Sequence, residues 1–241
     1  MKFLLTNDDG IGAPGLEALA RLVAGLAHGG GPESGLVIAP SAPASGISHA
    51  TTTDGPLRVN RLGERRHSVE GTPADCVRVA LHRHAGEFDW VLAGVNNGGN
   101  LGVDVYHSGT VAAVREAAIH GLPGIAISHY HNHPLADEDW ERAVRWARPV
   151  IEDLLARPWA RGQFWNINLP APELASDAPE VVHCSLDPSP LVLSFREEQD
   201  LLHYDGRYSL RPRRQGMDVD VCFGGRIAVT RMGVHVERTH A

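Results

Sequence analysis

The chain has 241 residues, of which 43% are hydrophobic, and it carries a formal net charge of −7 at pH 7. This length and composition predict a globular protein with one sizeable core, or one core with an extension. The acidic balance argues against a nucleic-acid duplex as partner, because duplex-binding proteins present a basic face and the basic clusters here, residues 65–66 and 211–214, are small.

Apolar runs of strand length alternate with helical patterns along the first 170 residues. The expected strands lie at residues 2–7, 35–40, 57–62, 90–95, 124–128 and 164–169, and the expected helices at residues 14–28, 73–84, 109–121 and 137–156. This alternation predicts a three-layer α/β fold, in which helices cover both faces of a mostly parallel, doubly wound, Rossmann-like sheet.

The domain organisation follows from a proline-rich stretch, residues 170–179, which closes this pattern. Residues 1–180 are expected to form the α/β core, with the parallel sheet complete by Pro170. Residues 181–225 are expected to form a β-rich C-terminal arm, because 181–214 lack helical periodicity. Residues 226–241 are interpreted as a strand and tail that return to the core.

Targeting and redox signals are weak in this chain. The apolar stretch before Thr6 is too short for a signal peptide, and no apolar run reaches the length of a membrane span. The three cysteines are odd in number and widely spaced, which indicates reduced, structural thiols. We therefore expect a cytoplasmic protein with no membrane partner.

Oxygen-bearing side chains follow three of the expected strands. Asp8 and Asp9 end the first, Ser45 lies in the loop after the second, and Asn96 follows the strand 90–95. The carboxyl ends of parallel strands lie at one edge of the sheet, so these four residues can meet there. Two adjacent carboxylates are costly to bury unless a cation lies between them. Such a set of oxygen ligands favours Mg²⁺, Mn²⁺ or Ca²⁺ over zinc or copper.

Two alternatives compete with a metal site at the first strand. Gly10 to Gly15 match the G-x-G-x-x-G pattern of dinucleotide-binding folds. Against this, the second strand ends in Ala39-Pro40-Ser41 rather than in a carboxylate, and Asp8 and Asp9 would oppose a pyrophosphate. The other alternative is structural, with the two acids forming a turn before a helix whose dipole favours them.

Two helix starts and one histidine cluster carry further polar groups. Thr72-Pro73-Ala74-Asp75 is explained by helix capping alone. In His107-Ser108-Gly109-Thr110, the hydroxyls beside free N–H groups fit phosphate binding and simple N-capping equally well. His129, His131 and His133 are interpreted as a solvated loop, with a ligand role as the lesser alternative.

Five motifs, taken in chain order, carry a resemblance to a known family: Asn7-Asp8-Asp9-Gly10-Ile11, Ala39-Pro40 with Ser45-Gly46, Gly71-Thr72-Pro73-Ala74-Asp75-Cys76, the Gly/Asn-rich run 94–102, and His107-Ser108-Gly109-Thr110-Val111. They resemble the SurE family of survival-protein nucleotidases over residues 1–128, and weaker matches resume at 166–170, 216–218 and 226–230. Ser41 and Ala44 depart from the usual Ala-Pro-Asp and Arg-Ser-Gly motifs, and Ala93 and Arg231 replace a usual Ser and Pro. None of these departures removes a predicted ligand.

The resemblance implies a metal-dependent phosphatase that acts on nucleoside 5′- and 3′-monophosphates. It implies one divalent cation per subunit, Mg²⁺ or Mn²⁺, held by Asp8, Asp9, Ser45 and Asn96. It also implies that the arm is a protruding hairpin exchanged between subunits, so that the protein is a homodimer or homotetramer.

The predicted mechanism is metal-assisted hydrolysis of a phosphomonoester. Asp8, Asp9 and Asn96 are the expected catalytic residues, and Asn100, Ser108, Gly109 and Thr110 are expected to bind the phosphate. A covalent aspartyl-phosphate at Asp8 stays open as an alternative to attack by water, and the leaving-group acid is not identified. The alternative functions are a non-catalytic nucleotide sensor and a dinucleotide-binding protein on the same fold.

Overall fold

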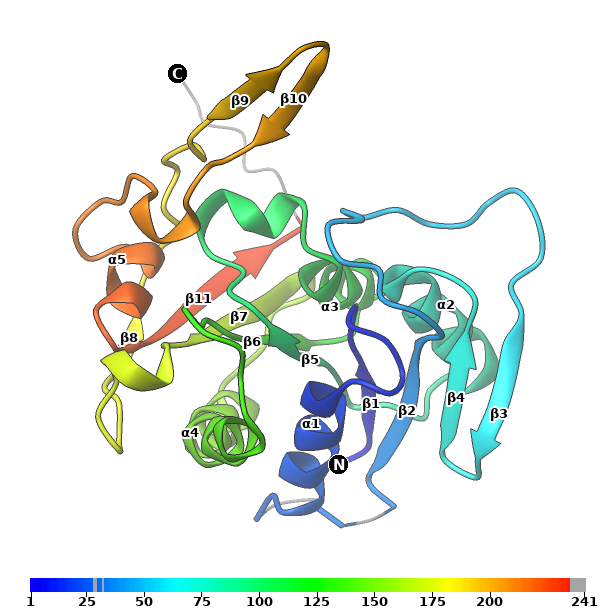
Figure 1. Ribbon diagram of the computed structural model, residues 1–241. Helices are drawn as coiled ribbons and strands as arrows, with labels where there is room; N and C mark the ends of the chain where they lie inside the picture. Colours follow the sequence, from blue (N-terminus) through cyan, green and yellow to red (C-terminus); the bar gives the residue numbers. More distant parts are fainter. Residues whose placement is uncertain (28–29, 32, 235–241) are drawn as a thin grey trace, which may run out of the picture.

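The structure is a computed structural model that describes residues 1–27, 30–31 and 33–234. Within these residues the main sheet has nine strands in the order β3-β4-β2-β1-β5-β6-β7-β11-β8 (Figure 1). The strands are β1 (Phe3–Thr6), β2 (Gly35–Pro40), β3 (Val59–Gly63), β4 (Arg66–Val69), β5 (Trp90–Asn97), β6 (Gly124–His129), β7 (Gln163–Leu169), β8 (Val181–His183) and β11 (Ile227–Gly233). The pairs β3–β4 and β7–β11 are antiparallel, and the other neighbouring strands run parallel.

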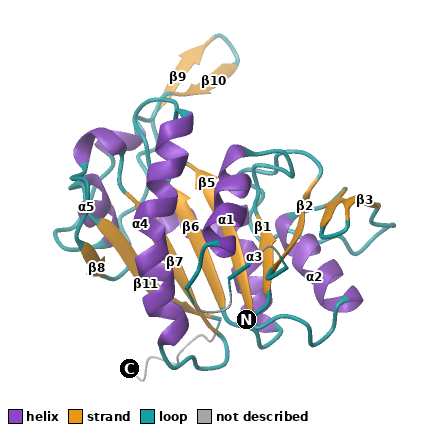
Figure 2. Ribbon diagram, turned by 90° about the horizontal axis from the view of Figure 1, so that it is seen from below, coloured by secondary structure: helices purple, strands orange, loops and turns teal. Residues whose placement is uncertain are grey.

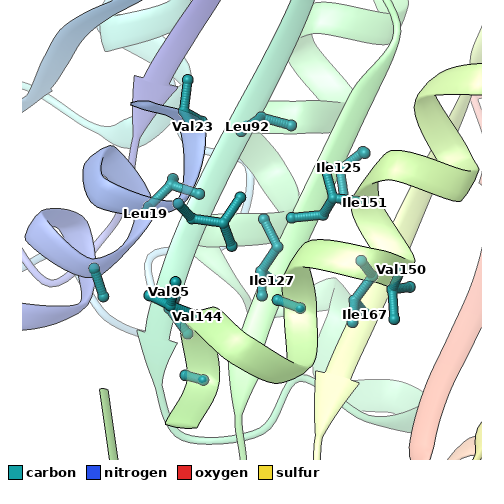
Figure 3. Close-up of a cluster of buried hydrophobic side chains, with 14 of the residues drawn as sticks. Leu19, Val23, Leu92, Val95, Ile125, Ile127, Val144, Val150, Ile151 and Ile167 are labelled. Carbon is teal, nitrogen blue, oxygen red and sulfur yellow. The ribbon is translucent and has the colours of Figure 1, made fainter. Parts of the chain in front are cut away.

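Helices cover both faces of the sheet, as the alternating pattern predicts. Helices α1 (Pro14–Ala24) and α4 (Asp137–Ala156) lie in front of the strands in Figure 2, and α2 (Pro73–Arg83) and α3 (Gly109–Ile119) cover the opposite face. Consecutive residues of β1 show the two faces, because Phe3 and Leu5 pack with α1 and α4 while Leu4 packs with α2 and α3. Figure 3 shows part of the first cluster.

The three-layer α/β fold is therefore confirmed, with several corrections to its boundaries. The sheet is not complete at Pro170, because β11 and β8 continue it beyond β7. The strand β4, which is not among the expected strands, forms an edge hairpin with β3. Helix α1 ends at Ala24, earlier than expected, and residue 28 lies outside the described residues.

The predicted arm is shorter than residues 181–225. Its first residues form β8, and its last form α5 (Asp218–Phe223), which packs against β11 and β7. Only the antiparallel hairpin of β9 (Phe195–Glu198) and β10 (Leu201–Tyr204) projects away from the main sheet (Figure 1). The strand expected within residues 226–241 is β11, and residues 235–241 of the expected tail lie outside the described residues.

Short 3-10 helices connect several of these elements. They are η1 (Gly102–Tyr106), η2 (Pro172–Leu174) and η3 (Tyr208–Leu210). The segment η1 leads directly into the start of α3. Across the described part of the chain, no helix is both long enough and apolar enough to cross a membrane.

Candidate active site

The sheet order places the predicted polar residues at one edge. Strands β2, β1 and β5 are parallel neighbours, so the residues after each of them lie at the same edge of the sheet. The N-terminus of α3 also lies there. A Cβ atom added at Gly109 would lie 2.8 Å from the Cβ of Asp8, so only glycine lets this helix begin directly against the carboxylate. The fold thus brings Asp8 to a helix N-terminus.

Asp8 is a buried carboxylate with few compensating partners. Its side chain is 3% exposed and accepts a hydrogen bond from the hydroxyl of Thr110. Burial, and secondarily the charge of neighbouring Asp9, raise its pKa to about 6, although hydrogen bonds from the Thr110 hydroxyl and backbone oppose the shift. The ionised form of the Asp8 carboxyl is therefore disfavoured unless a positive charge lies beside it.

Asp9 extends this acidic pair toward β5. Its carboxylate accepts the backbone N–H of Asn97 at 2.9 Å, and burial raises its pKa above the usual value. Within the described residues, no side-chain ion pair involves Asp8 or Asp9. The two carboxylates thus fit a bound cation, which would supply the missing counter-charge.

Asn96 is placed by an irregularity in β5. The register between β5 and β6 shifts between Ala93 and Asn96. At this point Gly94 has φ of +134°, and a Cβ there would lie only 2.2 Å from the carbonyl oxygen of Ile127. The side-chain amide of Asn96 donates to the Gly98 carbonyl at 2.9 Å. This hydrogen bond leaves the side-chain oxygen as the atom of Asn96 suited to a hard cation.

Ser45 lies in the loop after β2. Backbone hydrogen bonds connect this loop to the site both before and after Ser45. The backbone N–H of Ala44 donates to the Asp8 carbonyl at 2.7 Å, and that of Ser48 donates to the His107 carbonyl at 2.9 Å. The loop is therefore anchored both to the acidic pair and to the residue before Ser108. Ser45 itself is exposed.

Ser108 and Thr110 have different partners at the start of α3. The Ser108 oxygen accepts the Val111 N–H at 3.0 Å, which is an N-cap. This leaves the hydroxyl proton of Ser108 able to donate to a phosphoryl oxygen, because capping uses only a lone pair. Thr110 is fully buried and donates its hydroxyl proton to Asp8. That contact differs from the predicted role, since the same proton cannot also be donated to phosphate.

Asn100 belongs to a buried network of polar side chains. Its side-chain nitrogen donates to the Ser128 hydroxyl at 2.8 Å, and its backbone N–H donates to the Asn168 side chain at 2.8 Å. The Asn100 carbonyl accepts from the side chains of Asn166 and Asn168 at 2.8 and 3.0 Å. These contacts fix the turn before η1. Sequence reasoning missed the network, although the N-x-N spacing of Asn166 and Asn168 places both on one face of β7.

His129 is not part of a solvated loop, as the sequence predicts, but a buried residue of β6. It is the last residue of β6 and is fully buried, with its ring 6.3 Å from Trp140 and 6.0 Å from Trp146 between centroids. Burial lowers its pKa to about 4. Within the described residues, no group of three or more His, Cys, Asp and Glu side chains could hold a metal. The candidate cation site accordingly needs neutral oxygens beside its two carboxylates.

Comparison with known proteins identifies relatives along nearly the whole chain. The protein alr3139 of Nostoc sp. (strain PCC 7120 / SAG 25.82 / UTEX 2576) is 46% identical over 234 residues, which cover 97% of this chain and 100% of that one. The 5′-nucleotidase SurE of Caulobacter vibrioides (strain NA1000 / CB15N) is 37% identical over 261 residues, covering 100% of this chain and 92% of that one.

The fold comparison agrees with these relatives. The crystal structure of the SurE protein from Aquifex aeolicus matches with a TM-score of 0.81 and 25% identity, covering 99% of this chain and 95% of that one. The family model described as survival protein SurE matches residues 3–187, which contain the acidic pair and the start of α3. The chain therefore belongs to the survival protein SurE family.

Proposed function

We propose that this chain is a metal-dependent phosphatase that hydrolyses nucleoside 5′- and 3′-monophosphates to nucleoside and phosphate. The observation that carries the proposal is the acidic pair of buried Asp8, set against the N-terminus of α3, and half-buried Asp9, neither of which has a cationic side-chain partner among the described residues. A cation beside a helix N-terminus forms a site for a dianionic phosphate. The name of the Caulobacter relative, 5′-nucleotidase SurE, supports the same substrate class.

The oxygen ligands that would hold one divalent cation, Mg²⁺ or Mn²⁺, come from Asp8, Asp9, Ser45 and Asn96. When bound, such a cation polarises a phosphoryl oxygen and lowers the pKa of water. Carboxylate, hydroxyl and amide oxygens suit these hard ions, whereas zinc and copper favour nitrogen and sulfur ligands. Thr110 keeps Asp8 oriented through its hydroxyl and stabilises its ionised form.

The start of α3 supplies the phosphate contacts in this proposal. The Ser108 hydroxyl and the Gly109 N–H donate to phosphoryl oxygens, and the helix dipole favours the negative charge. The absence of a side chain at Gly109 leaves its N–H accessible beside Asp8. Asn100 acts by fixing the turn that leads to this helix, through its contacts with Ser128 and Asn168. Because Asp8 is buried and already accepts from Thr110, a ligand role suits it better than that of a nucleophile.

The test is release of inorganic phosphate from adenosine 5′-monophosphate (AMP) and adenosine 3′-monophosphate by the purified protein. We expect release with added Mg²⁺ or Mn²⁺ and none in excess EDTA, with activity restored by the metal. A non-catalytic nucleotide sensor would bind these nucleotides without releasing phosphate. Full activity in excess EDTA would contradict the proposal.

We also propose that the chain forms a homodimer or homotetramer through the hairpin β9–β10. Several large apolar side chains of the hairpin, and Leu193 just before it, are exposed; those of the hairpin are Phe195, Leu201, Leu202 and Tyr204. The Asp205 N–H donates to the Ser194 carbonyl at 3.0 Å, so the two ends of the hairpin are adjacent. Replacing residues 195–204 with two glycines should leave a folded monomer, measured by sedimentation. An unchanged oligomer would show that another surface makes the contact.

The proposed location is the cytoplasm. Cys76, Cys184 and Cys222 are free thiols, and Cys76 and Cys222 are buried. Free thiols persist in reducing compartments, which supports this location. Detection of the protein in an oxidising compartment would contradict it.

A further inference from the structure

A cleft begins at the acidic pair and runs away from α3. It measures about 460 Å³ and is lined by residues 9–15, Ser41, Pro43, Asn97, Leu135 and Trp140. This volume lies in the range of about 300–1,000 Å³ that is usual for small-molecule sites. A larger cleft, of about 720 Å³, lies along β8 and β11 and contains none of the proposed cation or phosphate ligands.

We propose that the cleft beside Asp9 is the subsite for the nucleoside base of the substrate. The proposal rests on the proposed function. It adds where the nucleoside, the part of the substrate that is not transferred, would bind. Asp9 belongs both to the acidic pair and to the wall of the cleft, so a phosphate at the cation places its nucleoside at the mouth of this space. The opposite side of the acidic pair is occupied by α3.

The walls of the cleft suit a flat, apolar ring. Ile11 and Leu135 are partly buried and pack on the core between α1, α4 and the sheet. Pro14 adds its ring, and Trp140 closes the interior with 6% of its surface exposed. A base can lie against these side chains while its ribose stays near Asp9 and Asn97. Burial of apolar surface is the main source of affinity in such sites.

The turn that forms one wall is held in place before any ligand binds. The Ile11 N–H donates to the Pro40 carbonyl at 2.8 Å, and the Asn7 side chain donates to the Gly10 carbonyl at 2.9 Å. Arg66 donates to the Ile11 carbonyl and pairs with Glu17. A preformed wall lowers the entropy that binding would otherwise cost.

The cleft continues into an acidic groove between α1 and α4. The two spaces share Pro14 and Trp140, and the groove is lined by Glu17, Asp137, Glu138 and Glu141. Its basic residue, Arg21, is paired with Glu141 at 3.0 Å. Glu17 is likewise paired with Arg66, so a second phosphate or a polynucleotide running along the groove would meet the carboxylates of Asp137 and Glu138. The charge therefore favours an uncharged base at the end of a monophosphate.

Gly12 offers a way to fill the cleft without disturbing the fold. A Cβ added there meets no atom within 4 Å, and Gly12 has no left-handed backbone conformation that would strain a side chain. Gly12→Phe therefore adds a ring to the cleft wall. Ala160→Phe is the matched control, because Ala160 is an exposed residue in the loop after α4, outside the lining of the cleft.

The experiment measures kcat/KM with Mg²⁺ for AMP and for ribose 5-phosphate, which carries the same phosphate without a base. We expect the wild type to prefer AMP. Gly12→Phe should lower kcat/KM for AMP at least about tenfold and leave kcat/KM for ribose 5-phosphate within about twofold of the wild type. The tenfold loss corresponds to about 1.4 kcal/mol of interaction with the base, which ribose 5-phosphate lacks. The control should behave as the wild type with both substrates.

Three results would overturn the subsite: no wild-type preference for AMP, equal losses on both substrates in Gly12→Phe, or no loss in Gly12→Phe. Binding of adenosine, measured by calorimetry, provides a second readout that needs no turnover. It should be lost in Gly12→Phe and kept in Ala160→Phe. If neither substrate releases phosphate but adenosine still binds in this pattern, the proposed function fails while the base subsite stands.

Discussion

Asp8 and Asp75 are both buried aspartates beside a helix N-terminus, but their pKa values are shifted in opposite directions. Asp75, in the first turn of α2, is fully buried and accepts hydrogen bonds from the backbone and hydroxyl of Thr52 at 2.9 and 2.8 Å, and from the Thr72 N–H at 3.0 Å. Burial alone would raise its pKa, but these hydrogen bonds outweigh burial and lower it. Asp8 has fewer donors and an acidic neighbour, and its pKa is raised to about 6.

The difference separates a structural carboxylate from a functional one. Asp75 is complete within the protein, because its oxygens are surrounded by donors and Arg78 lies 3.6 Å away. Asp8 and Asp9 have no such set of partners, and in the proposed function a cation would supply the missing charge. Without it, their burial costs the fold part of its stability. Whether a buried carboxylate is structural or functional can therefore be judged only from the hydrogen-bond donors that surround it.

The largest expected effect is on turnover at the incomplete pair. Asp8→Asn or Asp9→Asn should lower kcat by about 10²-fold or more, because each removes a charged ligand from the cation site. Circular dichroism should show an unchanged fold. Phosphate release from AMP at saturating Mg²⁺ measures the effect. Near-normal turnover in both variants would return the pair to a purely structural role.

Asp75→Asn should have the reverse profile. Its amide cannot accept all the donors that surround the carboxylate, so the free energy of unfolding should fall by about 3 kcal/mol. Turnover per folded molecule should be retained, because Asp75 contacts no proposed ligand of the cation or phosphate. Urea denaturation in EDTA, alongside the activity assay, measures both. A loss of turnover without a loss of stability in Asp75→Asn would show that Asp75 is not a purely structural carboxylate.

The pH dependence of the metal-free protein should differ in sign at the two sites. Because the pKa of Asp8 is raised from 3.8 to about 6, the folded state binds the proton more tightly, and stability falls as pH rises between these values. Metal-free Asp8→Asn should thus gain up to about 3 kcal/mol at pH 8 and nothing near pH 4. Asp75, with its lowered pKa, stabilises the fold above pH 3.8 and loses this contribution as pH falls below.

Denaturant midpoints in EDTA across this pH range measure both contributions. Wild type, Asp8→Asn and Asp75→Asn form the matched set. If the Asp8→Asn protein is no more stable than the wild type at pH 8, the acidic pair is already compensated without a cation.

Ser108→Ala should give the smallest effect, divided between stability and catalysis. Loss of the N-cap should cost about 1 kcal/mol of unfolding free energy. Loss of a donor to the phosphoryl group should lower kcat at least about tenfold, below the full effect of removing such a donor. Thermal unfolding and single-substrate kinetics separate the two contributions. Near-normal turnover in a less stable protein would leave Ser108 as a cap only.

The fold was predictable where the sequence pattern is strong and local. Residues 35–40 and 137–156 form β2 and α4 with the expected ends, since the first is a continuous apolar run and the second has a helical apolar period. The strands β4 and β8 were not predicted, because they are four and three residues long and carry polar or exposed side chains. His129 was misjudged because its polar neighbours in the sequence suggest a loop, whereas Trp140 and Trp146 of α4 enclose it.

By itself, the sequence determined that Asp8 and Asp9 follow a buried strand, that Asn96 lies near the end of another, and that Ser108 caps a helix. Strand and helix periods are properties of neighbouring residues. Only the tertiary structure decided that the Thr110 hydroxyl is directed at Asp8, that Asn100 joins Asn166 and Asn168, and that a cleft opens beside Asp9. The hydrogen bonds among them join residues 66 to 102 positions apart, and the order of strands in the sheet brings these residues together. That order depends on packing across the whole core, which no local pattern encodes.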